Sequence, residues 1–127
     1  MRSYTLMPMA QIFLAGKDWQ ARALLRAQLL EEGLKVEAYE TVPEAVASLE
    51  SRERLPDLFL ADLSRSDDPG SDAELLAAWG KQVPVWVIAG RNLIAQKTLK
   101  GLGFEVILFR PVDVGELTEQ LKRRVER

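Results

Sequence analysis

An aspartate that directly follows a short apolar segment is the clearest chemical feature of this sequence. The segment 58–61 reads Leu-Phe-Leu-Ala, and Asp62 follows it. Four apolar residues without polar alternation are too few for a helix and predict a strand buried on both faces. In an open parallel sheet, ligands bind beyond the carboxyl ends of the strands. Asp62 is therefore predicted to lie at such an edge, either as a functional carboxylate or as a cap for the next turn.

The residues that end the other predicted strands bear on what Asp62 can do. Gly16 and Lys17 follow one apolar run, Ala89 ends a second, and Arg110 follows a third. One interpretation makes Asp62 a strand-end carboxylate held by Lys17 or Arg110, and the other makes it a reactive group. The sequence contains no His and no Cys, which removes the commonest general base, thiol catalysis and thiolate metal sites. We expect no catalytic residue, no metal ligand set and no enzymatic activity.

The segments that must position these residues alternate between strand and helix patterns. Five strands are predicted, at 11–15, 34–39, 58–61, 83–89 and 104–109. Helices are predicted after the N-cap candidates Asp18, Thr41, Ser71 and Asp113, with a weaker helix at 92–102. This alternation predicts an α/β domain, a flavodoxin-like, doubly wound (βα)5 fold with a five-stranded parallel sheet.

The helical periodicity also predicts which side chains face the core. In the first helix, Ala21, Leu25 and Leu29 recur every four residues with Leu24 beside them, and Gly33 ends the helix. In the third helix, the predicted inner face consists of Leu75, Leu76 and Trp79.

Length and charge limit the functional classes. The chain has 127 residues, which suits one domain, and its net charge of -2 favours neither nucleic acid nor an anionic membrane as a partner. No apolar run approaches the length of a membrane span. Residues 1–10 are predicted to form a tail, residues 11–127 a single domain, and the protein is expected in the cytoplasm.

The order and spacing of these features resemble the CheY-like receiver domain of bacterial response regulators. The resemblance runs from about residue 12 to about residue 125 and places Asp62 at the position of the phospho-accepting aspartate. The other matching residues are Arg22, Leu25, Leu29, Gly33, Pro56, Asp57, Gly70, Pro84, Arg110 and Pro111. The resemblance implies a role in two-component signal transduction or a phosphorelay.

The sequence departs from this family at the positions that take part in Mg²⁺ binding and phosphoryl transfer. Gly16 and Lys17 replace the pair of acids that binds Mg²⁺, Ala89 replaces a Thr or Ser, and Arg110 replaces a Lys. Mg²⁺ needs oxygen ligands, and phosphoryl transfer depends on the metal as counter-charge. The resemblance and its departures therefore predict a pseudo-receiver with a degenerate site, which has lost Mg²⁺ binding and uses no other cofactor.

The function expected from this resemblance is a signalling module that acts through protein–protein interaction. Its partners would be a histidine kinase or a downstream signalling protein, and residues 92–127 would form a docking or homodimer surface. Two alternatives stay open. One is a functional receiver that is phosphorylated on Asp62 in an unusual site. The other is a small flavodoxin-like ligand-binding domain, although the sequence has no Gly-rich phosphate loop.

Overall fold

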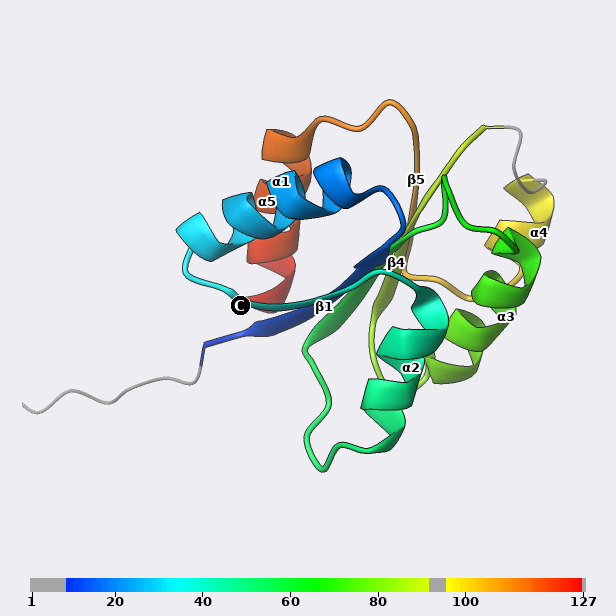
Figure 1. The fold of residues 1–127 in the computed structure, drawn as a ribbon, viewed down its shortest axis with the longest axis horizontal. Helices are drawn as coiled ribbons and strands as arrows, with labels where there is room; N and C mark the ends of the chain where they lie inside the picture. The colour runs from blue at the N-terminus through cyan, green and yellow to red at the C-terminus, as the bar shows by residue number, and fades with distance from the viewer. Residues whose placement is uncertain (1–8, 92–95, 127) are drawn as a thin grey trace, which may run out of the picture.

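The computed structural model describes residues 9–91 and 96–126 of the chain. It contains one parallel sheet in the order β2-β1-β3-β4-β5, with helices on both faces (Figure 1). This is the flavodoxin-like order predicted from the alternation of elements. The strands are β1 Gln11–Gly16, β2 Lys35–Tyr39, β3 Leu58–Asp62, β4 Val85–Ala89 and β5 Val106–Phe109. The helices are α1 Trp19–Glu31, α2 Val42–Glu50, α3 Pro69–Trp79, α4 Gln96–Lys100 and α5 Val114–Val125.

Each face of the sheet has its own hydrophobic cluster. Helices α1 and α5 cover one face, and α2, α3 and α4 cover the other (Figure 1). Successive side chains of a strand point to opposite faces, so Ile12 and Leu14 pack under α1 and α5 whereas Phe13 packs under α2 and α3. All five residues of β3 and of β4 are buried, as expected for central parallel strands.

The predicted N-caps are confirmed at three of four helices. The Asp18, Thr41 and Asp113 side chains accept hydrogen bonds from backbone amides of the first turns of α1, α2 and α5. The prediction that Ser71 caps the third helix is wrong. Asp68 is the cap, and its Oδ1 accepts from the Ser71 amide at 3.1 Å.

The proline at the start of α3 explains this difference. Pro69 occupies the first helical position, where its fixed φ is compatible with a helix and its missing N–H leaves no unsatisfied donor. The helix therefore begins earlier than the sequence pattern suggested. The weaker helix predicted at 92–102 is present as α4, which ends at Lys100, two residues earlier than predicted, and residues 92–95 lie outside the described residues.

Two predicted core positions are exposed instead. Leu24 is 51% exposed and Leu75 is 36% exposed, whereas their neighbours Leu25 and Leu76 are buried. In a helix, consecutive residues are 100° apart, so only one of two adjacent leucines can point straight at the sheet. Gly33, at φ 84°, ends α1 in the left-handed conformation that favours glycine.

No helix among the described residues is long and apolar enough to cross a bilayer.

The adjacent leucines of α3 give a matched test of this packing. Leu76→Ala should lower the free energy of unfolding by about 2–5 kcal/mol because it leaves a cavity under the sheet. Leu75→Ala should change it by roughly 0.5 kcal/mol, as is usual for surface substitutions. Urea denaturation of both variants measures the difference, and equal losses would contradict the placement of α3.

Candidate functional site

The strand register brings the predicted site residues to one edge of the sheet. Gly16 of β1 lies beside Asp62 of β3, Asp62 lies beside Ile88 of β4, and Ala89 lies beside Phe109 of β5. Arg110 directly follows β5, and its amide donates to the Ala89 carbonyl at 3.0 Å. All four predicted strand-end residues therefore meet at the carboxyl edge.

The Asp62 carboxylate is almost fully buried and fully hydrogen-bonded. Its side chain is 9% exposed. Oδ1 accepts from the Ser64 amide at 3.0 Å and from the Ser64 hydroxyl at 2.6 Å. Oδ2 forms an ion pair with Nη2 of Arg110. Both carboxylate oxygens thus have protein partners, which a buried charge requires.

Ser64 links the two charged groups into a closed triangle. Its hydroxyl donates to Asp62 and accepts from Nε of Arg110 at 3.1 Å. The guanidinium therefore contacts the carboxylate directly and through the serine, which fixes its orientation. The sequence predicted that Lys17, Arg110 or both hold Asp62, but it gave no sign that the Ser64 side chain takes part. A serine two residues after an acid is too common to predict such a contact.

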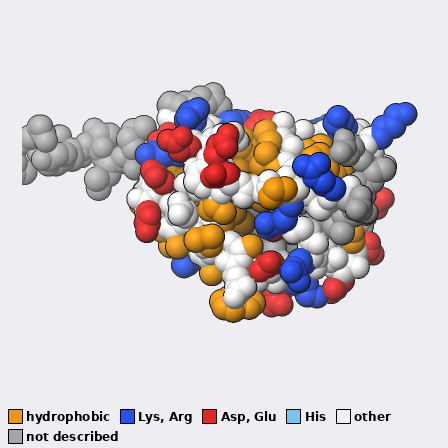
Figure 2. Space-filling view, turned by 90° about the horizontal axis from the view of Figure 1, so that it is seen from above, with side chains coloured by type: hydrophobic (Ala, Val, Ile, Leu, Met, Phe, Trp, Pro, Cys, Tyr) orange, Lys and Arg blue, Asp and Glu red, His pale blue; other side chains and the backbone are white. Residues whose placement is uncertain are grey.

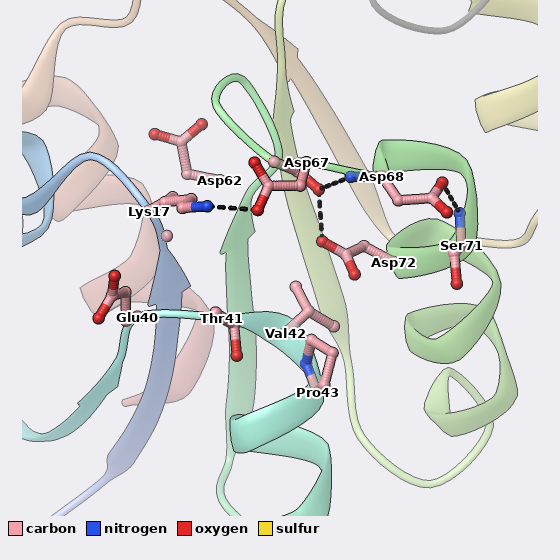
Figure 3. Close-up of a pocket in the computed structure, with 12 residues that line it drawn as sticks. Lys17, Glu40, Thr41, Val42, Pro43, Asp62, Asp67, Asp68, Ser71 and Asp72 are labelled. Carbon is pink, nitrogen blue, oxygen red and sulfur yellow. Dashed lines mark hydrogen bonds and ion pairs between the residues drawn. The ribbon is translucent and has the colours of Figure 1, made fainter.

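Lys17 forms no ion pair with Asp62. Its Nζ is paired with Oδ2 of Asp67 in the loop after β3, as Figure 3 shows. Hydrogen bonding to Asp67 raises the pKa of Lys17 above its ordinary value. Of the two cations proposed to hold Asp62, the structure assigns that role to Arg110 and corrects the expectation for Lys17. The Lys17 ammonium is instead taken up by Asp67, which lies in the loop after β3.

Gly16 allows β1 and β3 to end unusually close together. A Cβ atom at this position would lie 3.2 Å from Cβ of Asp62, which is tighter than ordinary van der Waals contact. The backbone carbonyl of Gly16 accepts from Nη1 of Arg22, so α1 is also tied to this strand end. The glycine therefore has a packing role beside Asp62.

A cavity of about 280 Å³ lies on one side of Asp62 (Figure 3). It is formed by the loops that follow β1, β2 and β3. Its lining includes Lys17, Thr41, Val42 and Pro43, together with the acidic residues Glu40, Asp62, Asp67, Asp68 and Asp72. Thr41 and Asp68 are occupied as helix caps and Asp67 by Lys17. Most polar groups around the cavity are thus already committed to local structure.

The acidic residues around this edge come from several separate loops and helix starts. Across residues 9–91 and 96–126, no group of three or more Asp, Glu, His or Cys side chains is placed to hold a metal ion. At the strand ends themselves, Gly16 offers no side-chain oxygen and Lys17 brings a cation. A hard divalent cation would find one carboxylate there, already paired with Arg110.

Charges of both signs share this end of the molecule. Figure 2 looks onto the carboxyl edge and shows acidic and basic side chains interspersed with hydrophobic ones. Besides the pairs at Asp62 and Asp67, Arg65 lies 3.6 Å from Asp18. The edge is therefore a set of local ion pairs, without a broad field of one sign.

Known structures with the same fold were found by structural comparison. A CheY-like response regulator receiver domain protein from Methanospirillum hungatei JF-1 superposes with a TM-score of 0.78, at 21% identity over 94% of this chain and 95% of that one. A response regulator receiver protein from Burkholderia phymatum gives 0.75, at 18% identity over 92% and 95%. The chemotaxis protein CheY4 of Vibrio cholerae gives 0.72, at 18% identity over 91% and 98%.

Comparison of the amino-acid sequence alone found no such relatives. No protein-family model matches it, and no curated protein matches it either. The likeness to these structures is one of fold, since each shares less than a quarter of its residues with this chain.

Asp18, which caps α1, makes the stability of the folded protein depend on pH. The Ala21 amide, which donates to Oδ1 at 3.2 Å, lowers the pKa of Asp18 below its ordinary value of 3.8, and nearby Arg65 acts in the same direction. A carboxyl with a depressed folded-state pKa contributes stability above the unfolded-state pKa and loses it as pH falls through the folded one.

Acid titration tests this contribution. Asp18→Asn keeps the capping geometry but removes the charge. The variant should therefore lose less stability than the unmodified protein as pH falls below about 4. Urea denaturation across this range, with an NMR titration of Asp18, measures the effect. An Asp18 pKa at or above 3.8 would contradict the assignment.

A double-mutant cycle tests the pair at the centre of the site. Arg110→Met keeps much of the side-chain stem but leaves a buried carboxylate with only Ser64 as donor, so it should cost about 2 kcal/mol. In the background of Asp62→Asn, the same change should cost about 1 kcal/mol or less, because no charge is left unpaired. Additive losses in urea denaturation would mean that the two side chains are not coupled.

Proposed function

Because the chain has the fold of CheY-like response-regulator receiver domains, we propose that it is an atypical, pseudo-receiver module of cytoplasmic two-component signalling. It acts through protein–protein contacts and carries out no catalysis. In this proposal, Arg110 takes over the neutralisation of Asp62, and Mg²⁺-dependent phosphorylation of Asp62 does not occur.

The observation that supports the proposal most directly is the occupancy of both Asp62 oxygens. Ser64 donates twice to Oδ1, and the Arg110 guanidinium is paired with Oδ2. A carboxylate that attacks a phosphoryl group needs one oxygen free to approach the phosphorus. Here that approach would require breaking a nearly buried, charge-assisted contact. Asp62 is thus better suited to hold the edge together than to react.

The residues around Asp62 do not fit Mg²⁺. Mg²⁺ takes near-octahedral oxygen coordination, usually with one or two carboxylates and several waters. Gly16 and Lys17 supply no oxygen ligand from their side chains, and the Lys17 ammonium lies on the cavity side of the edge. Without a divalent ion, the repulsion between an anionic carboxylate and an anionic phosphoryl donor is only partly offset by one arginine.

Ala89 lacks the side-chain hydroxyl that a phosphorylated receiver would use at this position. Its methyl side chain is fully buried at the end of β4 and has no hydroxyl to donate to a phosphoryl oxygen. A phosphoryl group on Asp62 would therefore find no side-chain hydroxyl at the end of β4 to donate a hydrogen bond to it. This supports a module whose binding surface is constant and is not switched by phosphorylation.

The proposed docking surface for a kinase or a downstream signalling protein is residues 92–127, of which 96–126 are described. Strand β5 is an edge strand, and its four apolar residues Val106–Phe109 are all partly exposed. Beside it, a hollow of about 170 Å³ is lined by Leu108, Phe109, Pro111 and the start of α5. A partly exposed apolar edge with an adjoining hollow suits a protein partner.

Incubation with Mg²⁺ and acetyl phosphate tests the proposal. We expect intact-mass spectrometry to find no added phosphoryl group, because the nucleophile is paired and no metal site neutralises the donor. Asp62→Asn is the control, and a conventional receiver domain treated in parallel shows that the donor is active. A mass increase of one phosphoryl group that Asp62→Asn abolishes would overturn the proposal in favour of a phospho-accepting receiver.

A further inference from the structure

The two edge strands of the sheet differ in how they are protected. At one edge, β2 carries Lys35 and Glu37, and Glu37 is paired with Arg52. Charged side chains on an edge strand discourage the pairing of a further strand. At the other edge, β5 consists of the apolar residues Val106–Phe109, which are all partly exposed. Strand β5 thus contains neither a charged residue nor a proline that would block another strand.

The outer side of β5 presents unpaired backbone groups. The Glu105 amide donates to the Val85 carbonyl of β4 at 3.0 Å. Backbone groups alternate between the two sides of a strand, so the amides and carbonyls of Val106 and Leu108 point away from β4. Within residues 9–91 and 96–126, these four groups have no hydrogen-bond partner. An extended chain offers donors and acceptors at the same two-residue repeat, and a helix does not.

We propose that β5 binds an extended segment of a partner protein, which is added to the sheet as a sixth strand. This inference rests on the proposed function as a protein-binding module and specifies the form that the partner takes. In this mode of binding, main-chain hydrogen bonds to Val106 and Leu108 supply affinity, and pockets for alternate side chains supply specificity. The pocket that β5 offers is the hollow at its C-terminal end.

This hollow favours an aliphatic side chain of the added strand. It has a volume of about 170 Å³ and lies where β5 meets the start of α5. Its apolar lining consists of Leu108, Phe109, Pro111, Val112 and Leu117. Cβ atoms of directly opposed residues on neighbouring strands are about 5 Å apart, so a side chain opposite Leu108 can reach the hollow. One aliphatic residue of the partner therefore anchors the segment.

The charge beside the hollow favours a basic residue near this anchor. Asp113 and Glu116 contribute to the lining, and both are exposed. Asp113 uses Oδ1 to cap α5, whereas the Glu116 carboxylate has no ion-pair partner among the described residues. At the start of β5, by contrast, Glu105 is paired with Arg124 at 2.7 Å. We therefore expect the partner to carry a Lys or Arg two residues from the anchor, on the same face of its strand.

A second copy of this chain fits this edge less well than a different protein. In an antiparallel pair of β5 strands, the start of each strand would lie beside the hollow of the other. That start carries Glu105, and Arg124 is already bound to it through two hydrogen bonds. The second copy would thus bring an acid and no unpaired cation to Glu116, which favours a partner of different sequence.

Amide exchange in the presence of a synthetic peptide tests the proposal. The probe is the acetylated and amidated peptide Thr-Lys-Thr-Leu-Thr-Lys-Thr, which places a lysine two residues from the leucine in either strand direction. By NMR, this peptide should slow the exchange of the Val106 and Leu108 amides at least about tenfold. The same peptide with Glu in place of both lysines should bind at least about threefold more weakly.

Two valines on opposite edges provide a matched control. Val106 of β5 and Val36 of β2 are both partly buried and pack against the same hydrophobic cluster. Val106→Lys should weaken peptide binding at least about tenfold, because a charge on the edge opposes strand addition. Val36→Lys should leave binding unchanged. Glu116→Gln should remove the preference for the lysine peptide over the glutamate peptide.

The contrary outcomes separate this inference from the proposed function. If neither amide is protected by the lysine peptide, or if Val36→Lys weakens binding as much as Val106→Lys, strand addition at β5 is wrong. The result with acetyl phosphate would stand in either case. Protection of both amides that grows with protein concentration in the absence of peptide would assign the edge to a second copy and refute a partner of different sequence.

Discussion

A nearly buried carboxylate needs a counter-charge, and this requirement organises the carboxyl edge of the sheet. Asp62 ends the central strand β3, where its side chain is 9% exposed and would be costly to leave ionised without partners. Arg110 reaches it from the end of β5, and Ser64 joins the two. The three residues connect β3 to β5 across the intervening β4. They tie the ends of these two strands together at the carboxyl edge.

The sequence predicted the fold well because the fold depends on features that are local in the chain. Apolar runs, helical spacing and the caps Asp18, Thr41 and Asp113 each act within a few residues. Even so, the pattern misplaced the start of α3, since both Ser71 and Asp68 are acceptable caps and only the backbone at Pro69 decides between them. Leu24 and Leu75 were misjudged for a related reason, because adjacent apolar residues do not reveal which one faces the sheet.

The site was harder to predict because its contacts join distant segments. Strand order alone brings Gly16, Asp62, Ala89 and Arg110 together, and that much could be foreseen. The choice of partner for Asp62 could not be foreseen. Lys17 and Arg110 are both cations at strand ends, but the loop after β3 carries Asp67 to Lys17 and leaves Arg110 to Asp62. Loop paths of this kind depend on tertiary packing, which short-range sequence patterns do not encode.

The close approach of Gly16 to Asp62 limits how this edge can change. A side chain at position 16 would press against Cβ of Asp62 at 3.2 Å, between two strands held in register by backbone hydrogen bonds. Introducing an acid there would add both steric pressure and a second negative charge beside Asp62, whose own charge is already paired with Arg110. Adding a carboxylate at position 16 would therefore require the strand ends to separate and the Arg110–Asp62 pair to loosen, and each of these changes should lower stability.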